Sequence, residues 1–347
     1  MELLRTARVV GLRRLWNQRR ALKWGWEGII RGHCMTRALQ TALQLNLLEA
    51  MRDDWLDPSA FAAERGLDAD VLTALCDYLY ARRVLRKKDG RFGLDERGRF
   101  LVETDLLQGW FKLVDGYEPV LHALGPLTSG RAHYGNGVRR DPELVAVGSG
   151  LASEGFYFPL VADIIRRKRW KTVLDIGCGD GTFLRSLCRA LPEVKAIGID
   201  LSGEAIARGC ATRDAQGLGD RIRLHQGDAL EIDQTGVLPA EVDAATSFFV
   251  LHELAAPGGD GELPSFLRRF RRTYPRTALI IVETIRPSAA ALRRRPGPAI
   301  EYFLLHDLSK QAPLDRERWQ RQLRGAGFTS IEERHLEFAR SAIYVAH

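Results

Sequence analysis

The sequence predicts an α/β protein in which a mainly helical N-terminal domain precedes a parallel sheet with helices on both faces. Two observations predict this fold. From Trp170 onward, short apolar runs of strand type alternate with helical segments, an alternation typical of parallel sheets. Before that point, residues 33–112 show apolar side chains at helical spacing. With 347 residues, the chain is also longer than one average domain.

Three segments follow from this reading: a helical module at 1–112, a helical linker with a long Gly/Pro-punctuated loop at 113–168, and the α/β domain at 169–347. Within the first segment, Asp89 and Gly90 separate two short alternating runs, which is a hairpin signal. Helices followed by a hairpin predict a winged helix. Its would-be recognition helix is mostly apolar, with few polar residues to read bases, so we expect a dimerisation module rather than a DNA-binding one.

Composition restricts the environment and the partners. The 51 basic and 44 acidic residues give a net charge of +7, which we interpret as solvated surface, with no nucleic-acid partner. Five cysteines without a Cys-x-x-Cys pair indicate a reducing, cytoplasmic setting. No apolar run approaches the roughly 18 residues of a spanning helix, and we expect no membrane partner. For the arginine-rich first 26 residues, an amphipathic segment, packing on a partner subunit is favoured over a membrane surface.

The stretch TVLDIGCGDGTF, Thr172 to Phe183, places three glycines between a strand and a helix. Gly177, Gly179 and Gly181 would permit a tight turn and the close approach of a ligand. The pattern is G-x-G-x-G rather than the G-x-G-x-x-G of dinucleotide folds. Because Asp175 stands just before it, an anion is disfavoured, and a ligand that carries an ammonium or sulfonium group is favoured.

Two further acids end the next strands of the predicted sheet. Asp200, followed by Leu201, ends the second strand, where a carboxylate accepts hydrogen bonds from both ribose hydroxyls. Asp228, followed by Ala229, ends the third strand and would accept from an adenine amino group. A cationic tail, a ribose and an adenine together describe S-adenosyl-L-methionine.

The motifs VLDIGCGDG, GIDLS and GDAL resemble, in order and spacing, the first three cofactor motifs of the class I S-adenosylmethionine-dependent methyltransferases. The resemblance implies a Rossmann-like, seven-stranded sheet at 169–347. The alternative is a nicotinamide-binding Rossmann domain. The N-terminal module resembles the winged-helix dimerisation domain of small-molecule methyltransferases, which implies a homodimer and a small-molecule substrate.

Two His-acid pairs follow the fourth and fifth strands. His252 and Glu253 lie in FFVLHEL, at the sheet edge where ligands of such folds bind. In related O-methyltransferases a histidine here is the general base; the alternative is a histidine that only shapes the loop. His306 and Asp307 lie in a helical stretch that would fold over the same edge. Two imidazoles and substrate oxygens would then hold a divalent metal.

This pairing resembles the α-keto acid C-methyltransferases, enzymes expected in secondary metabolism. There, two histidines hold a non-haem iron or a similar metal such as zinc. The keto acid chelates this metal, which stabilises the enolate of the acid. The segment YGNGVRRD resembles the family's substrate loop, which implies that Arg139 or Arg140 clamps the substrate carboxylate. Glu253, Asp307 or a hydroxide on the metal would take the proton. The alternative is a metal-free O-methyltransferase with His252 as base.

Overall fold

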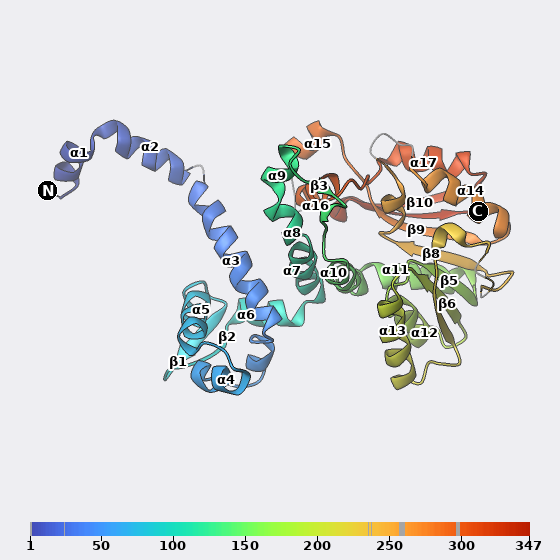
Figure 1. The fold of residues 1–347 in the computed structure, drawn as a ribbon, viewed down its shortest axis with the longest axis horizontal. Coiled ribbons are helices and arrows are strands. Elements are labelled where there is room, and N and C mark those ends of the chain that lie inside the picture. Colours follow the sequence, from blue (N-terminus) through green and yellow to red (C-terminus); the bar gives the residue numbers. More distant parts are fainter. Residues whose placement is uncertain (1, 24, 235, 237, 257–260, 296–298) are drawn as a thin grey trace. The chain divides into compact units, whose positions relative to one another are not determined.

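The computed structural model describes residues 2–23, 25–234, 236, 238–256, 261–295 and 299–347 (Figure 1). The chain forms two compact units, Met1–Phe111 and Lys112–His347. The first unit is mainly helical, and the second contains the large sheet. Both features of the predicted fold class are therefore confirmed, whereas a separate linker domain at 113–168 stays a prediction.

The first unit is a set of short helices around one hairpin. Its elements are α1 (Glu2–Val10), α2 (Leu12–Lys23), α3 (Trp26–Gln44), η1 (Glu49–Met51), α4 (Pro58–Arg65), α5 (Ala69–Ala81), β1 (Leu85–Lys88), β2 (Arg91–Leu94) and α6 (Glu96–Glu103). Helices α4 and α5 are capped by Asp57 and Asp68, which precede them and whose carboxylates accept backbone N–H groups of the first turn. Leu47, Cys76 and Phe92 are fully buried between the helices and the hairpin.

The predicted hairpin is present. Strands β1 and β2 pair antiparallel, with Leu85 opposite Leu94 and Lys88 opposite Arg91. The two turn residues, Asp89 and Gly90, have φ angles of 48° and 76°. Two successive left-handed residues match the twist of the flanking strands, which explains why an Asp-Gly pair is found here.

The second unit is built on seven strands and the helices that cover them. Helix α7 (Asp105–Gly116) contains the boundary, and the elements that follow are α8 (Glu118–His122), α9 (Leu124–Thr128), β3 (His133–Tyr134), β4 (Gly137–Val138), α10 (Pro142–Glu154), α11 (Tyr157–Lys168), β5 (Thr172–Ile176), α12 (Thr182–Ala190), β6 (Lys195–Asp200), α13 (Gly203–Ala215), β7 (Ile222–Gln226), η2 (Ala229–Glu231), β8 (Ala244–Phe248), η3 (Leu251–Leu254), α14 (Leu263–Thr273), β9 (Ala278–Thr284), α15 (Ala289–Arg294), α16 (Ala299–Leu308), α17 (Arg316–Gly325), β10 (Ile331–Leu336), η4 (Glu337–Ala339) and β11 (Ser341–Ala346).

The sheet has the order β10-β11-β9-β8-β5-β6-β7. Strands β5 to β9 run parallel, while β11 is antiparallel to β9 and to β10. The chain starts in the middle at β5, moves outward through β6 to β7, and returns to the other side of β5 as β8. Open α/β sheets bind ligands where the strand order reverses, outside the carboxyl ends of the strands. This topology therefore directs attention to the ends of β5 and β8.

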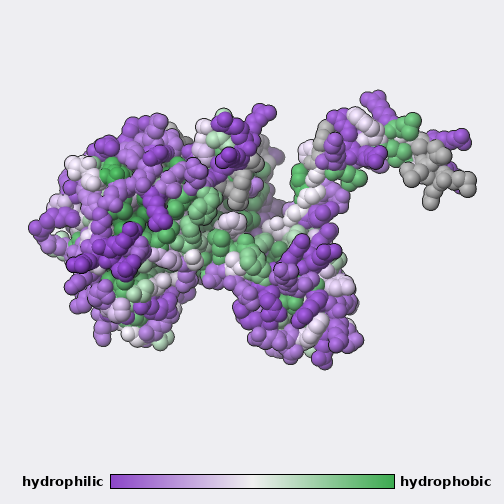
Figure 2. All heavy atoms as spheres, turned by 180° about the vertical axis from the view of Figure 1, so that it is seen from behind, coloured by the Kyte–Doolittle hydropathy of each residue, from purple (hydrophilic) through white to green (hydrophobic). Residues whose placement is uncertain are grey.

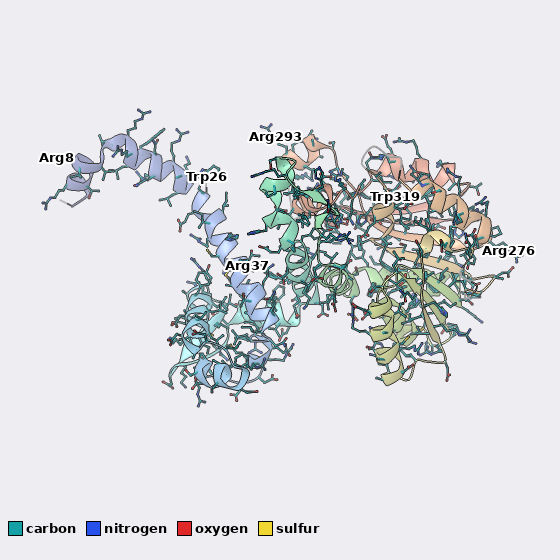
Figure 3. All side chains as sticks on the ribbon, viewed as in Figure 1. Arg8, Trp26, Arg37, Arg276, Arg293 and Trp319 are labelled. Carbon is teal, nitrogen blue, oxygen red and sulfur yellow. The ribbon has the colours of Figure 1, made fainter. Side chains whose placement is uncertain are left out.

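Both faces of the sheet are buried. One face packs against α14 and α17 through residues such as Phe266, Phe270 and the fully buried Trp319 (Figure 3). The other face packs against α11 and α12 through Val161 and Leu184, among others. Strand β9 is buried at every position, as expected for a central parallel strand covered on both sides.

One local prediction was wrong. Residues 115–143 do not form a long loop, because α8 and α9 and the short strands β3 and β4 occupy much of this segment. Pro119 lies in the first turn of α8. A proline there loses no helical hydrogen bond, since the first N–H groups of a helix have no partner within it. The proline thus marks a helix start rather than irregular chain.

On length and apolar content, no single helix among the described residues would cross a membrane. Helices α10 and α11 meet both criteria together, as a pair bent by 60°.

Candidate active site

The glycine loop between β5 and α12 has left-handed backbone at all three predicted positions. The φ angles of Gly177, Gly179 and Gly181 are 71°, 55° and 76°. A Cβ on Gly177 would lie 2.6 Å from a methyl group of Val250, so the loop and the segment after β8 are in close contact. Side chains at these positions would strain the backbone or push the neighbouring segment away.

Asp175 lies beneath this loop and is almost completely buried. Its carboxylate accepts a hydrogen bond of 2.7 Å from the Thr246 hydroxyl. Burial raises the pKa of Asp175 to about 7; nearby Asp200 adds to the rise and the Thr246 hydrogen bond opposes it. A buried carboxylate with this pKa favours a neighbouring cation, which would stabilise its ionised form.

Asp200, at the end of β6, holds the glycine loop in place. One carboxylate oxygen accepts from the Gly179 backbone N–H at 2.8 Å, and the other accepts from Ser202 N–H at 2.8 Å. Each oxygen keeps a second acceptor direction for a ligand hydroxyl. The next residue, Leu201, is 68% exposed. Backbone N–H groups thus hold both oxygens of Asp200, and each oxygen can still accept a hydrogen bond from a ligand.

Asp228 and Ala229 lie at the turn after β7. The Asp228 carboxylate caps η2 by accepting from the Leu230 N–H at 2.8 Å. Asp228, Ala229 and Leu230 are all half-buried. The strand ends of β5, β6 and β7 therefore present three carboxylates in a row along one edge of the sheet, as the sequence order of the motifs predicts.

The two predicted histidines meet. His252 lies in η3 after β8, and His306 lies near the end of α16; their ring centroids are 4.9 Å apart at an interplanar angle of 65°. Both side chains are buried. The ring of His306 also stacks on that of Tyr302, with centroids 3.8 Å apart. Helix α16 thus brings one imidazole to the other from a distant part of the sequence.

Each imidazole is anchored through Nδ1. His252 Nδ1 lies 2.8 Å from a Glu283 carboxylate oxygen, and His306 Nδ1 lies 2.7 Å from the backbone carbonyl of Tyr302. Both contacts require Nδ1 to donate, which leaves Nε2 as the acceptor in the neutral ring. His252 Nε2 is buried without a hydrogen-bond partner among the described residues. The pair therefore offers two imidazole lone pairs.

The surroundings act on the two histidines in opposite directions. Burial, reinforced by His252, holds the pKa of His306 well below its ordinary value, so this ring is neutral. Burial also lowers the pKa of His252, but the Glu283 carboxylate outweighs it and the net shift is upward. Glu283, fully buried in β9, was missed in the sequence; the signal was a lone acid in the otherwise apolar strand ALIIVET.

The two candidate arginines, Arg139 and Arg140, have different hydrogen-bond partners in the structure. Arg140 donates to Glu253 at 2.6 Å and to the Tyr117 hydroxyl at 2.9 Å, and the rings of Tyr117 and His306 lie 5.8 Å apart. Burial lowers the pKa of Arg140. The Glu253 carboxylate and the Tyr117 hydroxyl raise this pKa by more than burial lowers it, so the net shift is upward. Arg139 is exposed and donates twice to the backbone carbonyl of Gly135. Of these two arginines, Arg140 is the one that belongs to the cluster around the histidines.

The two candidate proton acceptors also differ. Both oxygens of Asp307 accept from Arg286, at 2.6 and 3.1 Å. Glu253 accepts through one oxygen from Arg140, and its other oxygen has no hydrogen bond within the described part of the chain. Tyr117 was not predicted; it connects Arg140 to Gln311, whose side-chain oxygen lies 3.2 Å from the tyrosine hydroxyl. In the described ranges, no three His, Cys, Asp or Glu side chains form a metal-binding group.

Comparison with known proteins agrees with both units. Residues 173–274 match the methyltransferase domain family, and residues 28–104 match the O-methyltransferase dimerisation domain family. The chain is 28% identical to an indolepyruvate C-methyltransferase of Streptomyces griseus, over 91% of this chain and 93% of that one. It is 26% identical to a 2-ketoarginine methyltransferase of Streptomyces arginensis, over 88% of each.

A solved structure described as PigF with SAH has the same fold. Its TM-score is 0.70 at 22% identity, and the alignment covers 94% of this chain and 99% of that one. The dimerisation-domain match supports a homodimer. With the sheet order and the glycine loop, these matches identify the chain as an S-adenosylmethionine-dependent small-molecule methyltransferase that carries an O-methyltransferase dimerisation domain.

Proposed function

We propose that this enzyme methylates the β-carbon of an α-keto acid, with a divalent metal held by His252 and His306. The observation that carries the proposal is the anchoring of both rings through Nδ1, which leaves two Nε2 atoms as ligands on adjacent imidazoles. Metal-binding histidines typically donate their other nitrogen to a carboxylate or a backbone carbonyl. His252 and His306 show one of each.

The donor set fits such a metal. The buried Nε2 of His252 has no partner within the described residues, and a buried polar atom left unsatisfied is costly. Two imidazoles, with no third protein ligand grouped with them among the residues that the structure describes, would leave coordination positions for substrate oxygens, an arrangement suited to iron(II) or zinc. When bound, such a metal would act as a Lewis acid on the keto oxygen and acidify the adjacent C–H.

Arg140 would bind the carboxylate of the keto acid. Its guanidinium is held by Glu253 and Tyr117 beside the histidine pair, and a planar guanidinium matches a carboxylate in a bidentate geometry. Of the two acids, Glu253 is the better-placed proton acceptor, because both Asp307 oxygens are already bound by Arg286. The substrate carbon would then bond to the methyl group of the cofactor in line, while the methyl–sulfur bond breaks and the sulfur keeps its electron pair.

The cofactor would lie across the three strand ends. Asp175 would face its positively charged amino-acid end, Asp200 its ribose, and Asp228 with Ala229 its adenine. The support for this placement is the buried carboxylate at β5 and the free acceptor directions of Asp200. Leu201, whose side chain is largely exposed, would cover the outer side of the ribose.

Two relatives support the substrate class: the indolepyruvate C-methyltransferase and the 2-ketoarginine methyltransferase. Each of them aligns with this chain over most of its length. A second function, O-methylation without a metal, is favoured by the His252–Glu283 contact. A carboxylate that orients Nδ1 also presents Nε2 as a general base toward a substrate hydroxyl.

The test is product analysis with a cofactor labelled by ¹³C in its methyl group. We expect a panel of α-keto acids to yield methyl groups on carbon, and His306→Ala to lose metal and activity together. Bound metal is measured in the purified protein before and after dialysis against a chelator. Methyl groups found only on oxygen, with full activity after the metal is removed, would establish the second function instead.

A further inference from the structure

A buried arginine, Arg185 of α12, lies next to the glycine loop. Much of the surface of the second unit is hydrophilic, as the purple atoms at the left of Figure 2 show, and charged side chains ordinarily remain at such a surface. Arg185 departs from this rule, because it is only 6% exposed, whereas Arg189, one turn further along the same helix, is exposed. Burying a guanidinium is costly unless it is paired and hydrogen-bonded, so the contacts of Arg185 need a reason.

Arg185 binds both the glycine loop and the first residue of α12. One terminal nitrogen donates to the backbone carbonyl of Asp180, which lies between Gly179 and Gly181. The other donates to the Thr182 hydroxyl at 2.8 Å and to the Asp180 carboxylate at 3.3 Å. That carboxylate in turn accepts from the backbone N–H and the hydroxyl of Thr182, at 3.0 and 2.6 Å. A single side chain thus ties the loop to the start of the helix.

The backbone carbonyl of Asp180 is enclosed by two helices. A Cβ built on Gly209 of α13 would lie 2.3 Å from its oxygen, and no backbone N–H of the described residues donates to it. Arg185 supplies the donor from the side of α12. Without this donor the carbonyl would lose its partner, which is costly for an enclosed polar group. The loop would relieve that cost by changing its backbone conformation, and the same loop carries the Gly179 N–H that holds Asp200.

Two general rules disfavour an arginine at this position. It is the fourth residue of α12, which begins at Thr182, and the amino end of a helix disfavours a nearby cation. Burial disfavours a cation as well. The contacts to Asp180 and Thr182 offset these costs, yet a well-packed apolar side chain would avoid them altogether. Residues that break such rules are concentrated at functional sites, and what these contacts serve is the shape of the glycine loop.

We propose that Arg185 is a positioning residue for the cofactor: it fixes the Asp180 carbonyl so that the Gly179 N–H keeps Asp200 oriented toward the ribose. The inference rests on the proposed placement of the cofactor across the strand ends. In this role Arg185 does not touch the cofactor, because Asp180 and Thr182 bind both of its terminal nitrogens. Its loss therefore weakens the binding of every ligand that carries the ribose, whatever the other end of the ligand is.

The experiment measures the affinities of two ligands by isothermal titration. S-adenosylhomocysteine has the amino-acid end of the cofactor, and 5′-methylthioadenosine lacks it. We expect Arg185→Met to weaken the binding of both by the same factor, about 10–100-fold, as for the loss of a hydrogen bond to a charged group. A loss confined to S-adenosylhomocysteine would overturn the proposal, since Arg185 would then bind the amino-acid end directly.

Arg185→Lys serves as the conservative variant. Lysine keeps the positive charge but has one nitrogen in place of the guanidinium fork. We expect it to bind both ligands with affinities between those of the unaltered protein and Arg185→Met. If Arg185→Met does not fold, Arg185→Lys carries the same comparison, and normal affinity of the lysine variant for both ligands would then overturn the proposal.

Arg221→Met is the matched control. Arg221 donates to the backbone carbonyls of Cys188 and Pro192 at 2.6 and 3.1 Å, so it holds the other end of α12. We expect this variant to lower the free energy of unfolding, measured by chemical denaturation, and to leave both affinities unchanged. If Arg185→Met loses stability but not affinity, or if both variants weaken binding equally, Arg185 is a structural residue and the proposal is overturned.

Asp200→Ala separates a failure of this inference from a failure of the cofactor placement. If Asp200→Ala weakens the binding of both ligands while Arg185→Met does not, the placement stands and the role of Arg185 is wrong. If Asp200→Ala binds both ligands normally, the placement itself is wrong, and the inference that rests on it is overturned as well.

Discussion

Glu283 accepts two hydrogen bonds from a single residue, His252. One comes from the backbone N–H at 3.1 Å and the other from the ring Nδ1 at 2.8 Å. Since β9 fixes Glu283, the carboxylate sets both the position of η3 and the orientation of the imidazole. Nε2 is left without a hydrogen-bond partner among the described residues, and the ring as a whole lies beside that of His306. Glu283 is thus a positioning residue in both proposed functions.

Glu283→Gln should separate charge from shape at this position. The amide keeps the size of the side chain but loses the charge, and it offers only one oxygen to two donors. We expect metal affinity to fall about 10–100-fold, as measured by competition with a metal-binding dye. Glu337→Gln, at an exposed glutamate, serves as the control. A variant that binds metal normally but loses turnover would instead favour His252 as a general base.

Arg140 and Arg139 provide a pair of adjacent arginines with different surroundings. Arg140→Met removes the donors to Glu253 and Tyr117, and we expect kcat/KM for a keto acid to fall about 100-fold, since a hydrogen bond to a charged group contributes about 1.5–3 kcal/mol. The loss should appear mainly in KM. Arg139→Met, which loses only contacts to the Gly135 carbonyl, should retain activity. Equal losses in steady-state assays of both variants would contradict the assignment.

Asp175 should make cofactor binding depend on pH. In the cofactor-free protein its pKa is raised from 3.8 to about 7, first by burial. If the charged end of the cofactor lies beside it, binding selects the ionised form. The dissociation constant should then fall about tenfold for each pH unit as pH rises toward 7, and level off above it. Isothermal titration across this range tests the slope, and Asp175→Asn should flatten it.

The same shift has the opposite sign for the stability of the cofactor-free protein. The folded state binds the Asp175 proton more tightly than the unfolded chain does, because its pKa is above the ordinary 3.8. The stability contributed by this group is full below pH 3.8 and is lost as pH rises through about 7. Thermal unfolding with and without cofactor should therefore diverge most near neutral pH. If the difference between the unfolding temperatures with and without cofactor does not change with pH, the positively charged end of the cofactor does not lie beside Asp175.

The order of the carboxylates at the sheet edge was predictable because it follows from local motifs. Asp175, Asp200 and Asp228 each lie within two residues of the carboxyl end of a strand, and the carboxyl ends of parallel strands lie at the same edge of a sheet. The His252–His306 contact was expected from a helical stretch that would fold over the same sheet edge, but the spacing of two histidines does not fix where α16 folds, and the resemblance to a family strengthened that expectation. Glu283 and Tyr117 were missed, since each depends on a tertiary contact: β9 lies next to β8, and Tyr117 reaches Arg140 and Gln311.

Gly209 offers a test of how α13 supports the cofactor loop. A Cβ at this buried position would overlap the backbone carbonyl of Asp180, in the loop between Gly179 and Gly181. Because that neighbour is backbone, Gly209→Ala should displace α13 or the loop, with a loss of about 1–3 kcal/mol in unfolding free energy. Cofactor affinity should fall with it, because the loop carries the Gly179 N–H that holds Asp200.

Gly150→Ala is the matched control for Gly209→Ala. Gly150 lies inside α10, and a Cβ added there would have no atom within 4 Å beyond its chain neighbours and the backbone of its own helix. Alanine there should stabilise the protein by about 0.5–1 kcal/mol, because it favours the helix more than glycine does. Chemical denaturation gives the two free energies, and isothermal titration gives the cofactor affinities. If both alanines shift stability in the same direction, or if Gly209→Ala leaves cofactor affinity intact, α13 does not support the loop in the way the contact implies.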